Sequence, residues 1–190
     1  LNRMLANIEN SQNHKDKLST TSIYGANFYE DNQYCSYISG VEVMKKLLPV
    51  LKSSSIVDFG CGTATWLFAA KKINKKLGID GEYVDRNFLL IDKEDFLPYD
   101  LTEYLNLEKK FDLAISMEVA EHLEEKYADI FVDNICRHSD IVLFSAAHVG
   151  QGGDGHINEQ PVTYWIEKFA KRNYRCIDIR HIYEKNYSIE

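Results

Sequence analysis

Short apolar runs alternate along the chain with longer segments in which apolar residues recur at helical spacing. The pattern predicts helices over residues 34–51, through residue 76, over 119–137 and over 161–173, and strands over 55–59, 77–80, 96–99, 111–117, 141–145 and 175–179. Such alternation is typical of a parallel sheet that is covered by helices on both faces. We therefore expect an α/β fold with a Rossmann-like, doubly wound, mainly parallel sheet.

The length of 190 residues fits one folded domain with an extension at its start. Residues 1–22 are polar and predict an N-terminal arm, and residues 23–190 predict a single domain. The four cysteines lack C-x-x-C spacing, which indicates neither a disulfide framework nor structural zinc and fits a cytoplasmic protein. Since no apolar run reaches about 20 residues, we expect no membrane insertion. The net charge of −7 disfavours nucleic acid as a partner.

A glycine-containing turn follows the first predicted strand and marks the expected ligand site. Gly60 and Gly62 allow the backbone to approach a ligand where the strand leads into the next helix. A dinucleotide-binding turn would have a further glycine where this chain has Thr65, so NAD fits poorly. Asp80 ends the second strand, where it can accept hydrogen bonds from both ribose hydroxyls. Asp58 lies just before the glycines, and Asp100 follows the third predicted strand. Three carboxylates around one turn suit S-adenosylmethionine, which carries an amino group and a sulfonium.

Several segments resemble the class I S-adenosylmethionine-dependent methyltransferases. They are residues 57–66 (VDFGCGTATW), 78–86 (GIDGEYVDR) and 99–102 (YDLT). Residues 111–123, 144–147 and 150–160 are similar to a small bacterial subgroup associated with surface polysaccharides, which includes enzymes that methylate capsular phosphoramidate. The chain departs from the family at Ala64, where a third glycine is usual. The sequence also stops soon after its sixth predicted strand, so we expect either that the family's last strand is missing or that this edge of the sheet is built differently.

The resemblance implies a bound S-adenosylmethionine and indicates the residues that would contact it. Asp100 follows the third strand, where its carboxylate could accept from the adenine amino group. Tyr24 lies in a segment that often folds over the cofactor in methyltransferases, where an aromatic ring favours a sulfonium. The complete expected set is Tyr24, Asp58, Gly60, Cys61, Gly62, Thr63, Trp66, Asp80, Gly81, Asp100, Leu101 and Met117.

Glu118, Glu121 and His122 form an E-x-x-E-H pattern at the start of a predicted helix. On a helix this spacing would place all three side chains on one face. Carboxylates with an imidazole suit Mg²⁺, Mn²⁺ or Fe²⁺, and some methyltransferases with this pattern bind a divalent metal. His156 would be the fourth ligand, with His148 as its substitute. Alternatively, the glutamates only complement a helix dipole and His122 is a general base without metal.

A glycine-dense loop precedes His156. It contains Gly150, Gly152, Gly153 and Gly155. Its length and composition predict a lid that closes over substrate. Within it we expect His156 to act as acid, base or metal ligand, and Asn158 and Gln160 to orient a polar substrate.

These features predict an S-adenosylmethionine-dependent O-methyltransferase with His122 and His156 as catalytic residues. The expected substrate is a small molecule or glycan precursor with a sugar, phosphoryl or phosphoramidate acceptor, used for a bacterial capsule or surface polysaccharide. One alternative is an RNA 2′-O-methyltransferase, because some of these enzymes share the E-x-x-E-H pattern and use metal. The other is a catalytically silent module that only binds cofactor. The sequence carries no signal for an oligomeric state.

Overall fold

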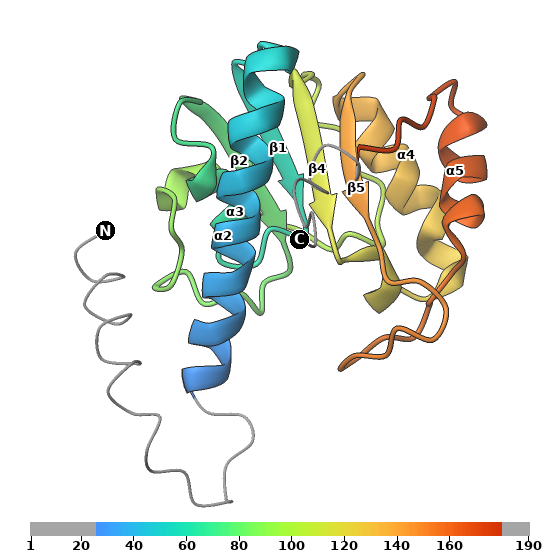
Figure 1. Ribbon diagram of the computed structural model, residues 1–190, viewed down its shortest axis with the longest axis horizontal. Coiled ribbons are helices and arrows are strands. Elements are labelled where there is room, and N and C mark those ends of the chain that lie inside the picture. The colour runs from blue at the N-terminus through green and yellow to red at the C-terminus, as the bar shows by residue number, and fades with distance from the viewer. Residues whose placement is uncertain (1–25, 180–190) are drawn as a thin grey trace, which may run out of the picture.

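A computed structural model describes residues 26–179 of the chain (Figure 1). The predicted arm, residues 1–22, lies outside this range, and so does Tyr24. The described part opens with helix α2 (Ala26–Leu51), which begins earlier than its sequence pattern predicted. This helix ends where Lys52 adopts a left-handed φ of 52°.

Five parallel strands form one sheet in the order β3-β2-β1-β4-β5. The strands are β1 (Ser55–Phe59), β2 (Lys75–Asp80), β3 (Phe96–Pro98), β4 (Leu113–Met117) and β5 (Val142–Ser145). Strands β1 and β4 lie in the middle and are almost entirely buried, which explains their unbroken apolar runs. The predicted parallel α/β sheet is confirmed, and each strand begins and ends within two residues of the prediction.

Helices cover both faces of the sheet and enclose two separate cores (Figure 1). Successive β1 side chains point to opposite faces. Ile56 packs on the side of α2 and α3 (Thr65–Ala69), whereas Val57 packs on the side of α4 (Ala128–His138) and α5 (Val162–Ala170). None of the helices within the described residues is long and apolar enough to cross a membrane.

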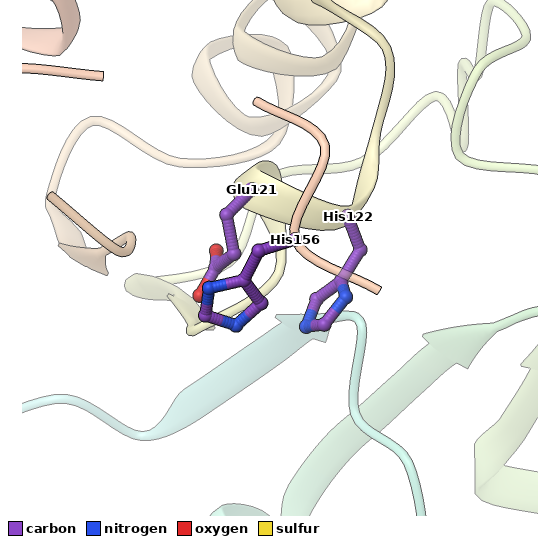
Figure 2. A group of neighbouring side chains, drawn as sticks. All are labelled: Glu121, His122 and His156. Atoms are coloured by element: carbon purple, nitrogen blue, oxygen red, sulfur yellow. The ribbon is translucent and has the colours of Figure 1, made fainter. Parts of the chain in front are cut away.

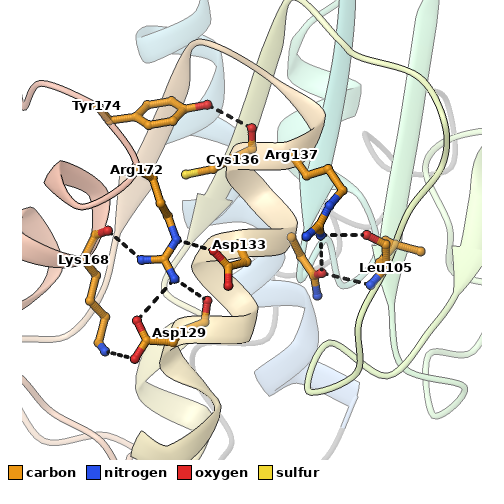
Figure 3. A network of polar contacts seen from close by, with 9 residues as sticks. Leu105, Asp129, Asp133, Cys136, Arg137, Lys168, Arg172 and Tyr174 are labelled. Carbon is orange, nitrogen blue, oxygen red and sulfur yellow. Dashed lines mark hydrogen bonds and ion pairs between the residues drawn. The ribbon is translucent and has the colours of Figure 1, made fainter.

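A polar network locks α5 onto α4 (Figure 3). Arg172, just after α5, donates to the carboxylate of Asp133 and to the main-chain carbonyl of Asp129, the latter at 2.9 Å. Lys168 Nζ lies 2.8 Å from Asp129 Oδ2, and the Lys168 carbonyl accepts from Arg172 at 2.7 Å. Charge-assisted bonds of this kind are stronger than neutral ones. Because α5 follows the glycine-dense loop, the network anchors the far end of that loop.

The helix after the glycine turn is shorter than predicted. It ends at Ala69 instead of Lys76, because Ala70 leaves the helical region with ψ of 56°. The chain then enters β2, in which Lys75 pairs with Ser55. Lys75 and Lys76 are therefore strand residues, and the prediction that the helix runs through residue 76 is wrong.

The predicted continuous helix over residues 119–137 is also wrong. The chain instead makes two 3-10 turns, η2 (Ala120–His122) and η3 (Glu125–Tyr127), before α4 begins at Ala128. Glu118 has a φ of +55°, which a right-handed helix does not allow. Strand β4 therefore leads directly into tight turns, and these turns carry the E-x-x-E-H residues.

The predicted strand over residues 175–179 does not form. Within residues 26–179 the sheet ends at β5. Helix α5 stops at Ala170 instead of residue 173, and Asn173 takes a left-handed φ of 65°. Ile177 is 76% exposed, so the apolar alternation of this segment has no face to bury among the described residues.

Candidate active site

The turn after β1 has the positive φ angles that its glycines allow. Gly60 and Gly62 have φ of +83° and +52°, in the left-handed region that favours glycine. A Cβ on Gly60 would lie 2.4 Å from Val119 Cγ2, so only glycine fits there. Ala64, in the same turn, also adopts a left-handed φ of 66°, a conformation that costs about 1–2 kcal/mol for a residue with a Cβ.

Asp80 ties the end of β2 to this turn. Its Oδ2 accepts the Gly62 N–H at 2.7 Å, and its Oδ1 accepts the Gly81 N–H at 2.7 Å and the hydroxyl of Tyr83. The Asp80 side chain is largely buried, yet it faces the cavity described next. A carboxylate held in this way can accept hydrogen bonds from a ribose diol, provided that the Tyr83 hydroxyl gives way.

A cavity of about 880 Å³ runs along the carboxyl ends of β1 to β4. This edge of an open parallel sheet is where such folds bind ligands. Four carboxylates line it, and none of its described lining residues is a lysine or an arginine. The lining consists of Gly60, Asp80, Gly81, Glu82, Tyr83, Pro98, Tyr99, Asp100, Leu101, Glu118, Val119, His122 and Leu123. A cationic ligand of nucleoside size fits both the volume and the charge.

The predicted cofactor residues fall into two groups. Five of them line the cavity, namely Gly60, Asp80, Gly81, Asp100 and Leu101. Six others lie around the turn or at the end of β4 without lining it, namely Asp58, Cys61, Gly62, Thr63, Trp66 and Met117. The first group lines the cavity and the second lies beside it, and both remain predicted cofactor contacts.

Asp58 and Cys61 are buried beneath the turn. Burial, and then the nearby charge of Asp80, raises the pKa of the Asp58 carboxyl well above its usual range. Burial likewise raises the pKa of the Cys61 thiol, so it is not a reactive thiolate. The Trp66 ring lies against α2, where a Cβ on Gly40 would meet it at 3.5 Å, and it packs against the core on that side of the sheet.

Asp100 lies exposed at the cavity edge after β3. Its Oδ1 accepts the Thr102 hydroxyl at 2.7 Å and the Thr102 N–H at 2.9 Å. These bonds hold the pKa of the Asp100 carboxyl below its usual value, so the group is an ionised acceptor at neutral pH.

A second constellation adjoins the cavity at η2. Potential ligand atoms of Glu121, His122 and His156 lie within 4.8 Å of one another, and Figure 2 shows the three side chains side by side. The two imidazole rings meet edge to face, with centroids 4.9 Å apart. The main-chain N–H groups of Ile157 and Asn158 both donate to the Glu121 carbonyl, at 2.9 and 3.0 Å. These bonds bring residues far apart in sequence to one site.

The Glu121 carboxylate is fully buried, and neither of its oxygens has a hydrogen-bond partner among the described residues. Burial raises the pKa of Glu121. An unpaired buried carboxyl beside two imidazoles is costly unless a positive charge compensates it. The donor set of one carboxylate and two imidazoles therefore fits a divalent cation such as Mn²⁺ or Fe²⁺, and less closely the harder Mg²⁺.

Glu118 departs from the predicted metal set. Because it precedes η2 and is not on a helix, it does not join the cluster of the other three residues. The Glu118 Oε2 atom instead accepts from Gln151 Nε2 at 3.2 Å. The Oε1 atom of Gln151 lies 2.8 Å from His148 Nδ1. Glu118 and His122 line the cavity, whereas Glu121 and His156 do not.

Glu159, which the sequence pattern did not single out, holds the glycine-dense loop through hydrogen bonds. Glu159 accepts from the N–H groups of Gly150 and Gly152, at 2.8 and 2.6 Å, and faces His156 Nδ1 at 3.2 Å. These bonds lower the pKa of the Glu159 carboxyl. The H-x-x-E spacing between His156 and Glu159 was the available signal.

Asn158 and Gln160, which were expected to orient substrate, bond to each other. Gln160 Nε2 donates to Asn158 Oδ1 at 2.8 Å. The Asn158 side chain is buried and reaches the Ala120 carbonyl at 3.5 Å. Both residues therefore hold the segment after His156 in place.

Comparison with known proteins identifies the fold. A S-adenosylmethionine-dependent methyltransferase from Archaeoglobus fulgidus superposes with a TM-score of 0.59 and 14% identity, over 78% of this chain and 73% of that one. The small RNA methyltransferase HEN1 gives 0.56 and 15%, over 83% of this chain and 23% of that one. A sugar N-methyltransferase from a Streptoalloteichus species gives 0.55 and 16%, over 74% and 63%.

These similarities lie in the fold, since all three identities are low. The chain spans less than two thirds of the length of HEN1 and of the sugar N-methyltransferase. No protein-family model and no curated protein matches the sequence. The sheet order and the flanking helices are those of the Rossmann-like class I methyltransferase fold.

Proposed function

We propose that the protein is an S-adenosylmethionine-dependent O-methyltransferase. The observation that carries this proposal is the Asp80 carboxylate, which is held by Gly62 and Gly81 at the mouth of an acidic cavity on a methyltransferase fold. A ribose diol would bond to Asp80, and the adenine amino group would bond to Asp100. The sulfonium would be attracted by the surrounding carboxylates, which would repel a pyrophosphate.

The acceptor end of the cavity is where His122 and Glu118 line it. Methyl transfer is an in-line displacement, so the acceptor oxygen must be held about 3–3.5 Å from the methyl carbon. His122 is the group shared by the cavity and the neighbouring cluster, and it is the residue best placed to touch that oxygen. Its Nδ1 lies 3.2 Å from the Gly155 carbonyl, which leaves the Nε2 lone pair either to bind a cation or, where no cation is bound, to accept a proton from the acceptor hydroxyl.

The cluster of Glu121, His122 and His156 would hold a divalent cation. A bound cation supplies Lewis acidity that lowers the pKa of an acceptor hydroxyl. The buried, unpartnered carboxylate of Glu121 supports this part of the proposal. Without a cation, His122 would act as the general base alone.

The acceptor we propose is a small polar sugar-type hydroxyl, or a phosphoryl or phosphoramidate oxygen, on a precursor of a bacterial capsule or surface polysaccharide. The resemblance of residues 111–123 and 150–160 to the polysaccharide-associated subgroup supports it. So does similarity to a protein whose name describes a sugar N-methyltransferase. The similarity to HEN1 keeps RNA as the second candidate, although the acidic cavity and net charge of −7 oppose a phosphate backbone.

A methyl-transfer assay tests the proposal. The purified protein is incubated with S-adenosylmethionine, with and without Mn²⁺, and with nucleotide-activated sugars, a phosphoramidate or an RNA duplex, and products are identified by mass spectrometry. We expect a methylated small acceptor, lost in Asp80→Asn and kept in Asp92→Asn, which changes an exposed carboxylate away from the cavity. Product from RNA alone would favour the second candidate. No product from a protein that binds S-adenosylhomocysteine would favour a silent module.

A further inference from the structure

Glu159 gathers three donors that come from different parts of one loop. Its Oε2 accepts the N–H of Gly150, and its Oε1 accepts the N–H of Gly152 and faces Nδ1 of His156. The side chains of His156 and Glu159 are only 12% and 20% exposed, so water competes little for these bonds. A carboxylate with three such contacts fixes the backbone of the loop and the orientation of the ring at once.

The contact with Glu159 also determines which nitrogen of His156 carries the proton. A carboxylate oxygen only accepts, so Nδ1 must donate and a neutral imidazole then has a bare lone pair on Nε2. His122 has the same arrangement, because its Nδ1 lies 3.2 Å from the Gly155 carbonyl, which also only accepts. Both rings therefore present Nε2 as a lone-pair donor, as metal-binding histidines do.

The glycines of the loop fit this arrangement. Gly150 and Gly152, whose N–H groups Glu159 accepts, have φ of +83° and +70°. Gly153 lies against the imidazole of His156, where a Cβ would come within 2.5 Å of Cε1 and Nε2. The left-handed backbone and the close approach to the ring both favour glycine. The glycines of this loop therefore allow the contacts that Glu159 and His156 make.

We infer that Glu159 is a positioning residue that holds His156 in the Nδ1-protonated form and thereby sets the metal affinity of the Glu121, His122 and His156 cluster. The inference rests on the cation of the proposed function. It adds that the loop and the cluster are one unit, since the same carboxylate holds Gly150, Gly152 and His156.

The first test is the tautomer of His156 in metal-free protein. Nitrogen-15 NMR of the imidazoles in chelator, assigned with His156→Asn, should show a single form with bare Nε2 in the wild type. Glu159→Ala should give a mixture of tautomers. Glu159→Gln, which keeps an acceptor oxygen and the better chance of folding, should keep more of the wild-type form. Glu167→Gln removes the same charge from an exposed position on α5 and should change nothing.

The second test is Mn²⁺ affinity, measured by calorimetry and by electron paramagnetic resonance of free Mn²⁺. We expect a 10- to 100-fold loss in Glu159→Ala, a smaller loss in Glu159→Gln, and unchanged affinity for S-adenosylhomocysteine in both. An unchanged tautomer, or unchanged Mn²⁺ affinity, in Glu159→Ala overturns the inference. A wild type that holds one tautomer but binds no Mn²⁺ would overturn the proposal that the cluster holds a divalent cation. It would also overturn the part of the inference that concerns metal affinity. The tautomer result would still support the positioning of His156 by Glu159.

Discussion

Replacing Glu121 by methionine should stabilise the metal-free protein. The Glu121 side chain is fully buried, and neither of its oxygens has a partner among the described residues. Burial of a polar group without a hydrogen bond costs about 1–3 kcal/mol in proteins, and methionine fills a similar space without that cost. At about 2–4 °C per kcal/mol for a chain of this size, the Tm should rise by about 2–12 °C.

The assay is thermal and urea denaturation followed by circular dichroism, first in chelator and then in Mn²⁺. A cation present at 100 times its Kd should add about 2.7 kcal/mol to the unfolding free energy of the wild type, and nothing to that of Glu121→Met. Glu125→Met, on the exposed turn that follows, is the matched control and should stay within about 0.5 kcal/mol of the wild type. A Glu121→Met protein that is less stable than the wild type in chelator would show that the buried Glu121 carboxyl does not destabilise the metal-free protein.

Three further predictions concern the turn, the cavity and a buried histidine. Gly60→Ala should cost about 1–3 kcal/mol more than Gly62→Ala in urea denaturation, because a Cβ on Gly60 overlaps a neighbour whereas one on Gly62 meets open space. Tyr83→Phe should tighten S-adenosylhomocysteine binding about 3- to 10-fold in calorimetry, because the Tyr83 hydroxyl no longer competes for Asp80. Burial lowers the pKa of His138 from its usual 6.5. The unfolded chain therefore takes up this proton first as the pH falls, and the unfolding free energy should decrease below pH 6.5 in the wild type but less so in His138→Gln.

Each of these three predictions would be contradicted by a specific result. Equal costs for Gly60→Ala and Gly62→Ala would mean that the turn is not packed against Val119. Weaker binding in Tyr83→Phe would mean that the hydroxyl contacts the cofactor. An unchanged pH dependence in His138→Gln would mean that this histidine is not the group that titrates.

The sequence predicted the sheet correctly because its central strands are buried on both faces and must be continuously apolar. It failed where local conformation overrides periodicity. Residues 119–137 have helical spacing, but the left-handed φ of Glu118 and two 3-10 turns precede the helix. Residues 175–179 alternate like a strand, yet Ile177 lies exposed. Alternation of apolar and polar residues indicates a strand only where the edge of a sheet is available to pair with the segment.

The candidate site was predictable by residue type and less so by geometry. Glu121 and His122 were found from their motif, although the helix that was expected to align them is absent, and His156 was found from its place after the glycine-dense loop. Glu118 was grouped with them by that same helix, and it lies apart. Glu159 was missed because two of its three partners are backbone N–H groups, which a sequence does not show, and its H-x-x-E spacing from His156 was the one visible signal.

We propose that the acidic cavity binds S-adenosylmethionine through Asp80. Isothermal titration of metal-free protein with S-adenosylhomocysteine tests this binding, with Asp80→Asn and the exposed Asp92→Asn compared side by side. We expect binding to the wild type and to Asp92→Asn, and a loss of affinity of about 10-fold or more in Asp80→Asn, since two charged hydrogen bonds of about 1.5–3 kcal/mol each are at stake. Equal binding by all three proteins, or no binding by the wild type, would show that Asp80 does not hold the cofactor.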